Sequence, residues 1–392
     1  MTARRRHVVL VGGTSEPGGL HVHTADLACA LAAAGLRATI ACTSIDYFSP
    51  LLRGTPVALA MMPPPGDGAR AALALRARLA ALAPTDVVLC HGCFAQSGPL
   101  VLAAARSACR RLYTVEHRPV EGGASATPGR RLYGWWMSRL VLRAIAVSDE
   151  IQAQAVAAYG LGRGKVAVLP NWVDPSVRPA GPERRAAAKA ALGLPPGPVI
   201  GFHGRLAPEK RVDCLIAGFA RLPPERRAAA CLAIVGDGWK RRELEALAGG
   251  LGLGSEVRFL GWRPDPGEAV SAFDVAVLPS LEEGFPLGLM EAMAAGALCL
   301  AHPMSSTEAL LGDGRGLLRD LGAPQGLAEA LAAALDLPPA ARAALGAGAS
   351  RWVLAHHSRD ERLGRLLAAL GVPPSDAPPG DARPRRLEFP AP

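Results

Sequence analysis

The feature that most constrains the fold of this chain is an alternation of short apolar runs with helical patterns, which occurs twice. In the first half, the apolar runs lie at 7–13, 36–42, 86–90, 111–116, 144–148 and 166–170. In the second half, they lie at 198–204, 229–238, 256–261, 274–280 and 297–301. Continuous apolar runs separated by helical segments are typical of parallel strands that are buried on both faces. The sequence therefore predicts an α/β chain with two doubly wound, Rossmann-like parallel-sheet domains.

A proline-rich segment divides the two patterns. Residues 175–198 contain PSVRPAGPERR and LGLPPGP around a short alanine-rich helix, which is the composition of a linker. A chain of 392 residues is also too long for one ordinary core. We predict an N-terminal domain at 1–178, a linker at 179–197, a C-terminal domain at 198–355, a helix at 356–371 that returns to the N-terminal domain, and a disordered tail at 372–392. Parallel sheets bind ligands beyond the carboxyl ends of their strands, so two facing domains predict a cleft between them.

Helical spacing places the helices of the second domain. One helix is predicted over 209–221, starting at Pro208, and another over 287–295. The end of the chain predicts helices near 305–311, 324–335, 338–347 and 349–371.

The charge and the cysteines of the chain indicate which ligands and which cellular compartment to expect. The net charge is +9, but the arginines are scattered among apolar helix positions and form no long basic block. We expect a soluble protein with a positive field, and the alternative is that this field attracts anionic substrates or anionic lipid. Nucleic acid is disfavoured because aromatic residues do not alternate with arginine. The 8 cysteines are isolated except Cys90 and Cys93 in CHGC, which have redox-motif spacing but no second pair to complete a zinc site. A reducing cytoplasm fits these cysteines, and no apolar stretch reaches the roughly 18 residues of a membrane-spanning helix.

The stretch EEGFPLGLMEAMAAG at 282–296 combines two acids with a helix start. Glu283 precedes the predicted helix, and Glu291 lies eight positions later, one turn inside it. Pro286 suits the first turn of a helix, and the amides of Gly288 and Leu289 lack partners within the helix. A helix start with a residue that has no side chain is suited to binding an anion. The alternative is a capping acid followed by a glutamate that faces solvent.

A second stretch, FHGRLAPEKRVD at 202–213, brings two cations to the end of a predicted strand. Arg205 follows the strand, and Lys210 comes five positions later. A guanidinium offers a planar fork to phosphate oxygens, and an ammonium offers a compact charge, so the pair suits a diphosphate. The alternative is that Glu209 pairs with a neighbouring cation on a solvated helix.

These two stretches resemble the motifs of a known enzyme family. EGFPLGLMEAMAAG is similar to the E-x7-E motif of glycosyltransferase family 4, whose members are retaining enzymes of the GT-B fold. GRLAPEK is similar to the G-R-L-x-x-x-K motif that binds the donor phosphates in that family. Shorter matches follow in the family's order: IAVS (145–148), VLPNWVD (168–174), IVGDG (234–238) and VRFLG (257–261). The resemblance extends from about residue 7 to residue 371.

The resemblance implies roles in the C-terminal domain, which would be the donor side. Arg205 and Lys210 would bind the diphosphate of a nucleotide-sugar and stabilise it as the leaving group, and the amides of Gly288 and Leu289 would contribute to this binding. Glu283 would contact the donor sugar near its reacting carbon or its 3-hydroxyl.

The resemblance also implies how the nucleoside is bound. Glu291 would accept hydrogen bonds from the ribose hydroxyls. The base would lie against the backbone near Gly261, Trp262 and Arg263. No D-x-D metal motif is present, which agrees with a family whose own cations replace a divalent metal.

In the N-terminal domain, which would be the acceptor side, EPGGL at 16–20 is similar to the family's glycine-rich first loop. Gly18 and Gly19 would let the backbone approach the phosphates and the acceptor. His117 in EHRP matches a histidine that contacts the transferred sugar in relatives, although a loop histidine without that role stays open, and His91 follows a strand end and could face the acceptor. The chain departs from the family's pattern at Trp172, where glycine is usual, and at Trp239 and Pro286; these departures bear on the sugar and the acceptor more than on catalysis.

The resemblance therefore predicts a glycosyltransferase that moves a sugar from a UDP-sugar or GDP-sugar to an acceptor hydroxyl, with retention and without a metal. The acceptor would be a glycan, a lipid-linked molecule or a small molecule, as in polysaccharide or glycoconjugate biosynthesis. Residues 129–144, with several arginines and Trp135 and Trp136, could contact a membrane, so the protein would be cytoplasmic or at the inner face of the membrane. The alternative is that these tryptophans pack on the sheet or on the acceptor site.

Three other functions stay open. A nucleotide-sugar 2-epimerase shares the two-domain fold, but the ordered E-x7-E and G-R-L-x-x-x-K motifs argue against it. An NAD-dependent oxidoreductase is disfavoured because VGGTSEPGG lacks G-x-G-x-x-G and no ribose-binding acid follows the second strand. A non-catalytic sugar-nucleotide binding protein is disfavoured because all four charged residues of the two motifs are present.

Overall fold

The computed structural model describes residues 6–12, 18–62, 68–90, 98–120, 123–263 and 265–372. The chain divides into two compact units, each with its own parallel sheet. Unit 1 comprises Met1–Pro170 and Asp360–Pro392, and unit 2 comprises Asn171–Arg359. The predicted fold class of two doubly wound parallel-sheet α/β domains is confirmed.

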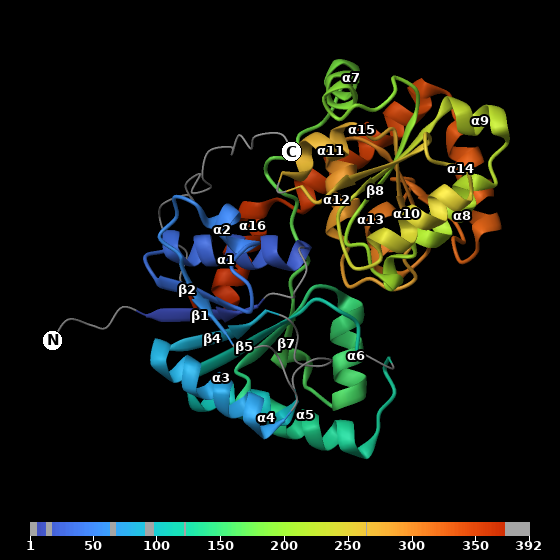
Figure 1. Ribbon diagram of the computed structural model, residues 1–392. Helices are drawn as coiled ribbons and strands as arrows, with labels where there is room; N and C mark the ends of the chain where they lie inside the picture. Colours follow the sequence, from blue (N-terminus) through green and yellow to red (C-terminus); the bar gives the residue numbers. More distant parts are fainter. Residues whose placement is uncertain are drawn as a thin grey trace. The chain divides into compact units, whose positions relative to one another are not determined.

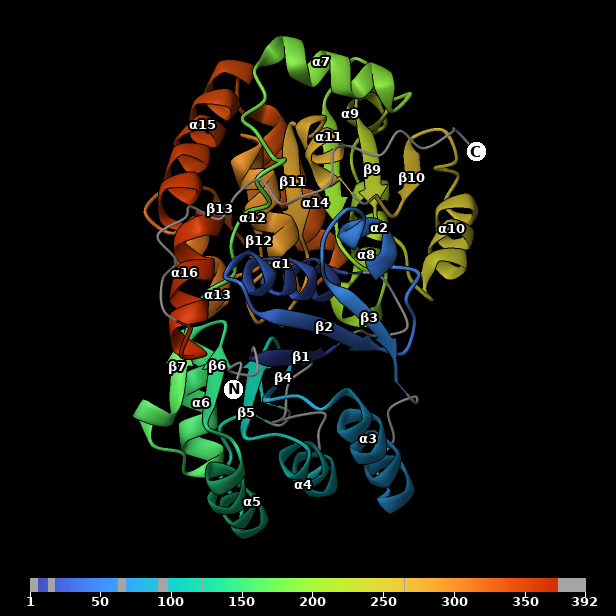
Figure 2. The ribbon, with the colours of Figure 1, turned by 90° about the vertical axis from the view of Figure 1, so that its left-hand side faces the viewer.

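Unit 1 contains a sheet in the order β3-β2-β1-β4-β5-β6-β7 among its described residues (Figures 1 and 2). Its strands are β1 (His7–Val11), β2 (Arg37–Cys42), β3 (Ala58–Met61), β4 (Asp86–Leu89), β5 (Arg111–Glu116), β6 (Arg143–Ala146) and β7 (Val166–Val168). Its helices are α1 (Gly19–Ala33), α2 (Phe48–Leu52), α3 (Ala69–Leu82), α4 (Pro99–Ser107), α5 (Pro128–Leu140), α6 (Asp149–Tyr159), the short 3-10 helix η1 (Arg163–Lys165) and α16 (Arg359–Ala369). All strand pairs are parallel, and β1 and β4 are buried along their whole length, as the apolar runs predicted.

The residues that follow α16 are hydrogen-bonded to side chains of the sheet of unit 1 and of the residue before it. Arg6 donates to the carbonyl oxygens of Leu370 at 2.6 Å and Gly371 at 2.8 Å. The hydroxyl of Tyr113 donates to the same Leu370 oxygen at 3.0 Å. The last described turn of the chain is therefore held by side chains from β5 and from the residue before β1.

Unit 2 contains a sheet in the order β10-β9-β8-β11-β12-β13. Its strands are β8 (Val199–His203), β9 (Cys231–Val235), β10 (Val257–Gly261), β11 (Val275–Leu278), β12 (Leu298–Ala301) and β13 (Leu317–Leu318). Its helices are α7 (Pro182–Ala191), η2 (Pro208–Lys210), α8 (Val212–Ala220), α9 (Pro224–Ala229), α10 (Arg241–Gly250), α11 (Pro266–Ser271), α12 (Leu287–Ala294), α13 (Ser305–Leu311), α14 (Pro324–Asp336) and α15 (Pro339–His356). Helices α11, α12 and α15 cover one face of this sheet, and α8, α10 and α14 cover the other (Figures 1 and 2).

The predicted helix bounds are wrong in two places. The predicted break at residue 348 does not exist, because α15 runs unbroken from Pro339 to His356, and the break lies instead before α16, which begins at Arg359. Helix α15 needs glycine at position 346 in order to pack, because a Cβ there would come within 2.2 Å of the Gly296 carbonyl oxygen. The helix predicted over 209–221 begins instead as η2 and restarts after Arg211, whose φ of 52° is left-handed and interrupts the α-helix.

The predicted linker region is packed on unit 2 through α7. Lys189 donates to the Asp274 carboxylate at 2.7 Å and to the Gly197 carbonyl at 2.8 Å. Arg185 donates to the Gly296 carbonyl at 3.2 Å. Within the described ranges, no helix combines the length and the apolar character needed to cross a membrane.

Candidate functional site

The two predicted cationic and acidic stretches of unit 2 meet at the carboxyl ends of β8 and β11. These strands are neighbours in the sheet. Lys210 follows β8 and Glu283 follows β11, and the Lys210 Nζ lies 2.5 Å from the Glu283 Oε1. The side chains are only 19% and 9% exposed, so the pair is largely removed from water. The fold thus brings together two predicted residues that are 73 positions apart in the sequence.

Gly288 lies where α12 packs directly on the end of β8. A Cβ at this position would come within 2.1 Å of the His203 carbonyl oxygen, a distance that real Cβ atoms do not show. The first turn of α12 therefore approaches β8 more closely than any side chain would permit. The amides of Gly288 and Leu289 belong to this first turn, where backbone N–H groups have no partner within the helix.

Glu291 is buried, and the alternative of a glutamate that faces solvent is wrong. Its side chain is 8% exposed, and its Oε2 lies 2.9 Å from the Nδ1 of His203. The carboxylate is therefore held at the end of β8, one helical turn from the predicted anion-binding amides.

Arg205 does not join the Lys210–Glu283 pair. Its guanidinium forms an ion pair with Glu209, and both side chains are about 30% exposed. The predicted alternative, in which Glu209 pairs with a neighbouring cation, therefore describes the contact that the structure shows. A ligand phosphate would have to draw Arg205 away from this partly solvated contact.

Glycines at the carboxyl ends of β8 and β9 let three backbone segments pack without side chains between them. Gly236 has a φ of 130°, and a Cβ there would come within 1.9 Å of the Gly204 carbonyl oxygen. The Gly236 N–H donates to the carbonyl of Gly261, the last residue of β10, at 2.8 Å. Arg263 follows this strand and is half-buried. The predicted base-binding backbone at 261–263 is thus adjacent to the turn that carries Gly236.

Sequence reasoning missed two residues of this site. His203 contacts Glu291 and supplies the carbonyl against which Gly288 packs. Ser306 at the start of α13 donates to the Glu283 carbonyl at 3.3 Å. His203 stands at the end of a predicted strand, next to Gly204 and Arg205, and that position was the signal that could have identified it; Ser306 offered no comparable signal.

The described residues among those predicted in unit 1 are Gly18, Gly19 and His117. Gly18 and Gly19 form the start of α1, and a Cβ at Gly18 would meet no described atom within 4 Å. Packing against the described residues therefore does not explain a glycine at position 18. Glu16 and Pro17 of the same loop, together with His91 and Cys93, lie outside the described residues.

His117 follows β5 and contacts a second histidine. The ring centroids of His23 and His117 are 4.7 Å apart in an edge-to-face arrangement. Burial lowers the pKa of His117 to about 4, and burial together with the nearby His117 lowers the pKa of His23 well below its usual value. Both imidazoles are therefore neutral at physiological pH and can accept or donate a hydrogen bond without carrying charge.

Cys90 is a buried thiol at the end of β4. Burial raises its pKa to about 12, so it is not a reactive thiolate. The described cysteines are all free and buried. Among the residues that the structure describes, no group of His, Cys, Asp or Glu is arranged to hold a metal ion.

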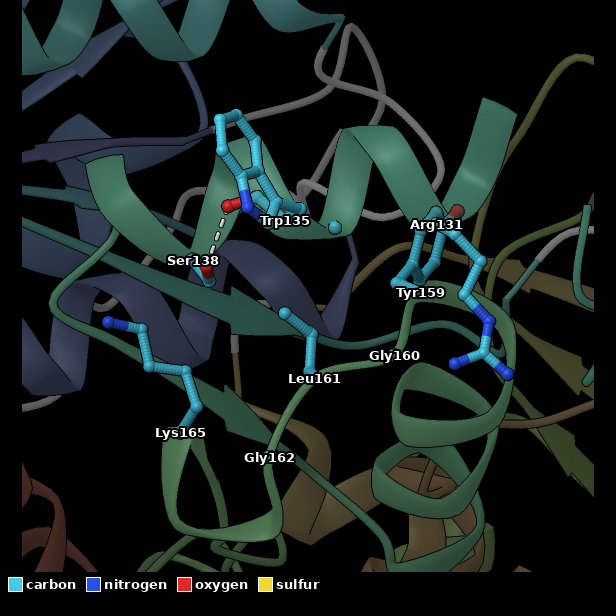
Figure 3. A pocket seen from close by; sticks show the side chains of 9 residues that line it. Arg131, Trp135, Ser138, Tyr159, Gly160, Leu161, Gly162 and Lys165 are labelled. Carbon is cyan, nitrogen blue, oxygen red and sulfur yellow. Dashed lines mark hydrogen bonds between the residues drawn. The ribbon is translucent and has the colours of Figure 1, made fainter. Parts of the chain in front are cut away.

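An open pocket of about 340 Å³ lies in unit 1 beside α5 and the turn after α6 (Figure 3). Arg131 and Lys165 lie at opposite ends of it, with Leu161 between them (Figure 3). Helices α5 and α6 touch closely here, since a Cβ at Gly134 would come within 1.9 Å of the Tyr159 carbonyl oxygen. The pocket adjoins the C-terminus of α6 and the start of β7, so it is at the amino edge of the sheet and apart from His117.

The two tryptophans of the 129–144 segment lie differently. Trp135 is 55% exposed, and the guanidinium of Arg139 lies 3.6 Å from the centre of its ring. Trp136 is half-buried. Trp135 therefore does not pack on the sheet, and packing of these tryptophans on an acceptor site stays a prediction.

Two family models match the chain, one in each half. Residues 17–177 match the model described as "Glycosyltransferase Family 4", and residues 197–336 match the model described as "Glycosyl transferases group 1". The first match contains Gly18, Gly19 and His117, and the second contains the Lys210–Glu283 pair.

Curated relatives with named activities are similar over part of their length. The chain is 37% identical over 225 residues to a D-inositol 3-phosphate glycosyltransferase of Streptomyces avermitilis, covering 53% of this chain and 47% of the relative. It is 30% identical over 245 residues to a 2-deoxystreptamine glucosyltransferase of Streptomyces kanamyceticus, covering 60% of this chain and 63% of the relative. The matched part therefore spans about half to two-thirds of the length of these relatives.

Solved structures share the fold over nearly the whole chain. The Anabaena protein HepE, solved with UDP and glucose, matches with a TM-score of 0.75 at 20% identity, covering 94% of this chain and 100% of the other. A sucrose-phosphate synthase from Thermosynechococcus elongatus matches with a TM-score of 0.74 at 20% identity, covering 94% and 99%. At this identity the likeness shows the fold alone, and the fold is GT-B.

Proposed function

Because the chain belongs to glycosyltransferase family 4, we propose that it is a retaining, metal-independent enzyme that moves a sugar from a nucleoside-diphosphate sugar, with UDP as the nucleotide, to an acceptor hydroxyl. One observation carries this proposal. A largely buried cation, Lys210, a carboxylate, Glu283, and the open first turn of α12 converge at the carboxyl ends of β8 and β11. A diphosphate needs cations and free amides, and a reacting sugar needs a nearby acid, so this arrangement suits both parts of a nucleotide-sugar.

In the proposed reaction, negative charge grows on the diphosphate as the bond to the sugar breaks. Lys210 and the amides of Gly288 and Leu289 would meet this charge, and such preorganised donors commonly contribute about 10²–10³ in rate each. Arg205 would add a second cation by exchanging Glu209 for a phosphate oxygen. Glu283 would lie beside the sugar, and Glu291 would accept from the ribose hydroxyls.

Unit 1 is proposed to bind the acceptor. His117 is neutral at physiological pH because burial lowers its pKa to about 4. A neutral imidazole can hydrogen-bond a sugar hydroxyl without repelling an oxocarbenium-like centre. Attack from the face that the diphosphate leaves would retain the configuration, and the described residues of the site include no evident nucleophile for the opposite face.

The names of the curated relatives favour a small acceptor. One of them acts on D-inositol 3-phosphate and another carries 2-deoxystreptamine in its name. Both compounds are polyhydroxylated cyclohexane rings. We therefore place a cyclitol-like small molecule first among the proposed acceptors, ahead of glycans and lipid-linked molecules.

The donor class is tested by thermal unfolding in the presence of EDTA with UDP, GDP, ADP, NAD or no ligand. A nucleotide at 100 times its dissociation constant adds about 2.7 kcal/mol to the free energy of unfolding. For a unit of this size, the expected rise in the unfolding midpoint is roughly 5–10 °C with UDP. Because EDTA is present, the same rise would support a donor site that works without a metal.

The other outcomes separate the competing functions. A rise with NAD alone would replace the proposal with an oxidoreductase. A rise with UDP, followed by epimer formation from the nucleotide-sugar without acceptor, would indicate a 2-epimerase. Binding with neither transfer nor epimerisation would leave a non-catalytic binding protein.

A peripheral contact with the inner face of a membrane is part of the same proposal. The side chains of Leu132, Trp135 and Leu142 are 67%, 55% and 52% exposed. The segment 129–144 contains arginines and no acid. The side chains of Arg131 and Lys165 form no hydrogen bond or ion pair with the described part of the chain, so both charges are available to anionic headgroups.

Vesicle sedimentation tests this contact. Replacing Arg131 and Lys165 together by glutamine is expected to weaken binding to phosphatidylglycerol vesicles about 30-fold, since each basic side chain near an anionic surface contributes about 1 kcal/mol. Trp135→Ser should weaken it further. Trp239→Ser is the matched control, because Trp239 is 63% exposed but belongs to unit 2. Equal sedimentation of all variants and the unchanged protein would remove the membrane from the proposal.

A further inference from the structure

Asn171 bonds to the loop that carries Glu283, although it lies far from that loop in the sequence. Its Nδ2 donates to the carbonyl oxygen of Phe285 at 2.8 Å. The Asn171 side chain is buried, with 3% of its residue surface exposed. Phe285 stands between Glu283 and Gly288, immediately before Pro286 at the start of α12. The bond therefore fixes the middle of the segment that joins the acid to the anion-binding helix turn.

His357 completes the arrangement from the other end of unit 2. Its ring Nδ1 lies 3.2 Å from the Asn171 carbonyl oxygen, and because a carbonyl only accepts, this nitrogen carries the proton. The N–H of Val173 donates to the His357 carbonyl at 3.0 Å. The His357 ring packs against Phe285, with ring centroids 5.3 Å apart. We call these four residues, Asn171, Val173, Phe285 and His357, the Asn171 cluster.

The Asn171 cluster joins both ends of unit 2 to the acid-bearing loop. The chain enters unit 2 at Asn171 and leaves it after Arg359. We call the two points where the chain passes between the units, at Asn171 and at Arg359, the crossings. The segments next to the two crossings are hydrogen-bonded to each other, and both contact Phe285. A change in the backbone at either crossing would therefore reach the loop through one hydrogen bond and one ring contact.

The Asn171 amide uses only its donor side in the hydrogen bonds that the structure describes. Its Oδ1 is buried and has no hydrogen-bond partner among the described residues. A buried acceptor without a partner opposes folding, so stability alone does not favour an amide here. Asn171 is also the only asparagine in the 392-residue chain. What the amide does supply is a donor aimed at Phe285.

We propose that Asn171 is a positioning residue for nucleotide-sugar binding: its amide holds the Phe285 carbonyl, and thereby the Glu283–Gly288 loop, in the conformation that receives the diphosphate. This inference rests on the proposed function of the donor site. It adds a residue that touches neither the donor nor the acceptor and whose effect is carried by the loop backbone.

The test uses Asn171→Asp, which has nearly the same shape but, when ionised, cannot donate to Phe285. At neutral pH and above, the dissociation constant for UDP is expected to rise about tenfold, the effect of one lost hydrogen bond, and kcat is expected to fall by a similar factor. The KM for the acceptor should not change. As the pH is lowered, the buried carboxyl takes up a proton and can donate again, so the UDP affinity of the variant should return toward that of the unchanged protein.

Ser176→Ala is the matched control, because Ser176 follows the same crossing but donates to Asp265 at 3.0 Å, away from Phe285. Hydrogen exchange at the Gly288 and Leu289 amides gives a readout that needs no ligand. Faster exchange in Asn171→Asp but not in Ser176→Ala supports the positioning role. Unchanged exchange with unchanged UDP affinity overturns it, and so does an equal loss in both variants. If the unchanged protein binds no nucleoside diphosphate, the proposed function fails, and exchange at these two amides decides on Asn171 by itself.

Discussion

Replacing Lys210 by methionine is expected to lower kcat about 10²–10³-fold, because the leaving diphosphate loses a largely buried cation at the end of β8. Methionine keeps most of the apolar stem and removes the charge. The measurement is steady-state transfer from the donor that the thermal-shift experiment identifies. Lys240→Met is the control, because Lys240 pairs with Glu243 at the start of α10 and is not part of this site.

The same change also has a cost in stability that must be separated from the loss of rate. Glu283 is 9% exposed, and without Lys210 its carboxylate would be buried without an opposite charge. Removing one partner of a buried ion pair typically costs about 3–5 kcal/mol, and the partial exposure of Lys210 places this pair at the lower end. The double variant Lys210→Met, Glu283→Gln removes both charges and should recover most of the stability while remaining inactive. Near-normal turnover in the single variant would contradict the assignment of the donor site.

The fold was predictable because several of its strands are mostly apolar runs that are buried along their whole length. Runs such as HVVLV and DVVL have no polar face, so they fit only a sheet that is covered on both sides. The order of the strands was not predictable in the same way. That β8 pairs with both β9 and β11 depends on where each crossover helix packs, and this is a property of whole elements. The short β3, β13, α2 and α9 were missed because they are too brief for a period to show.

The sequence predicted which site residues follow which strands, but it did not predict which of these residues contact each other. The sequence placed Lys210 after one strand and Glu283 after another, but their ion pair required these strands to be neighbours. For Glu291, the helical pattern gave a position on α12 and left its direction open. The contact with His203 exists because α12 packs on β8 at Gly288, which turns that face of the helix inward. Asn171 gave a motif match and a unique residue type, yet nothing in the sequence indicated Phe285 as its partner.

Replacing Gly288 by alanine is expected to destabilise unit 2 and to weaken UDP binding about 10²-fold. The added Cβ would meet the His203 carbonyl oxygen at 2.1 Å, and neither backbone can rotate away as a flexible side chain would. Helix α12 must therefore move off β8. Overpacking of this kind typically costs about 1–3 kcal/mol.

The loss of binding follows from the same displacement. The Gly288 and Leu289 amides and the Glu291 carboxylate all belong to α12, so moving the helix shifts three proposed donor contacts together, and a misplacement of about 1 Å can cost 10²-fold. Gly249→Ala is the matched control, because Gly249 lies inside α10 and a Cβ there would meet nothing within 4 Å. That substitution should raise the free energy of unfolding by about 0.4–1 kcal/mol and leave UDP affinity unchanged. Calorimetric unfolding and UDP titration of both variants check these results. If Gly288→Ala bound UDP as tightly as the unchanged protein, the close packing of α12 on β8 would not be what positions the donor, and the helix would have to be removed from the proposed site.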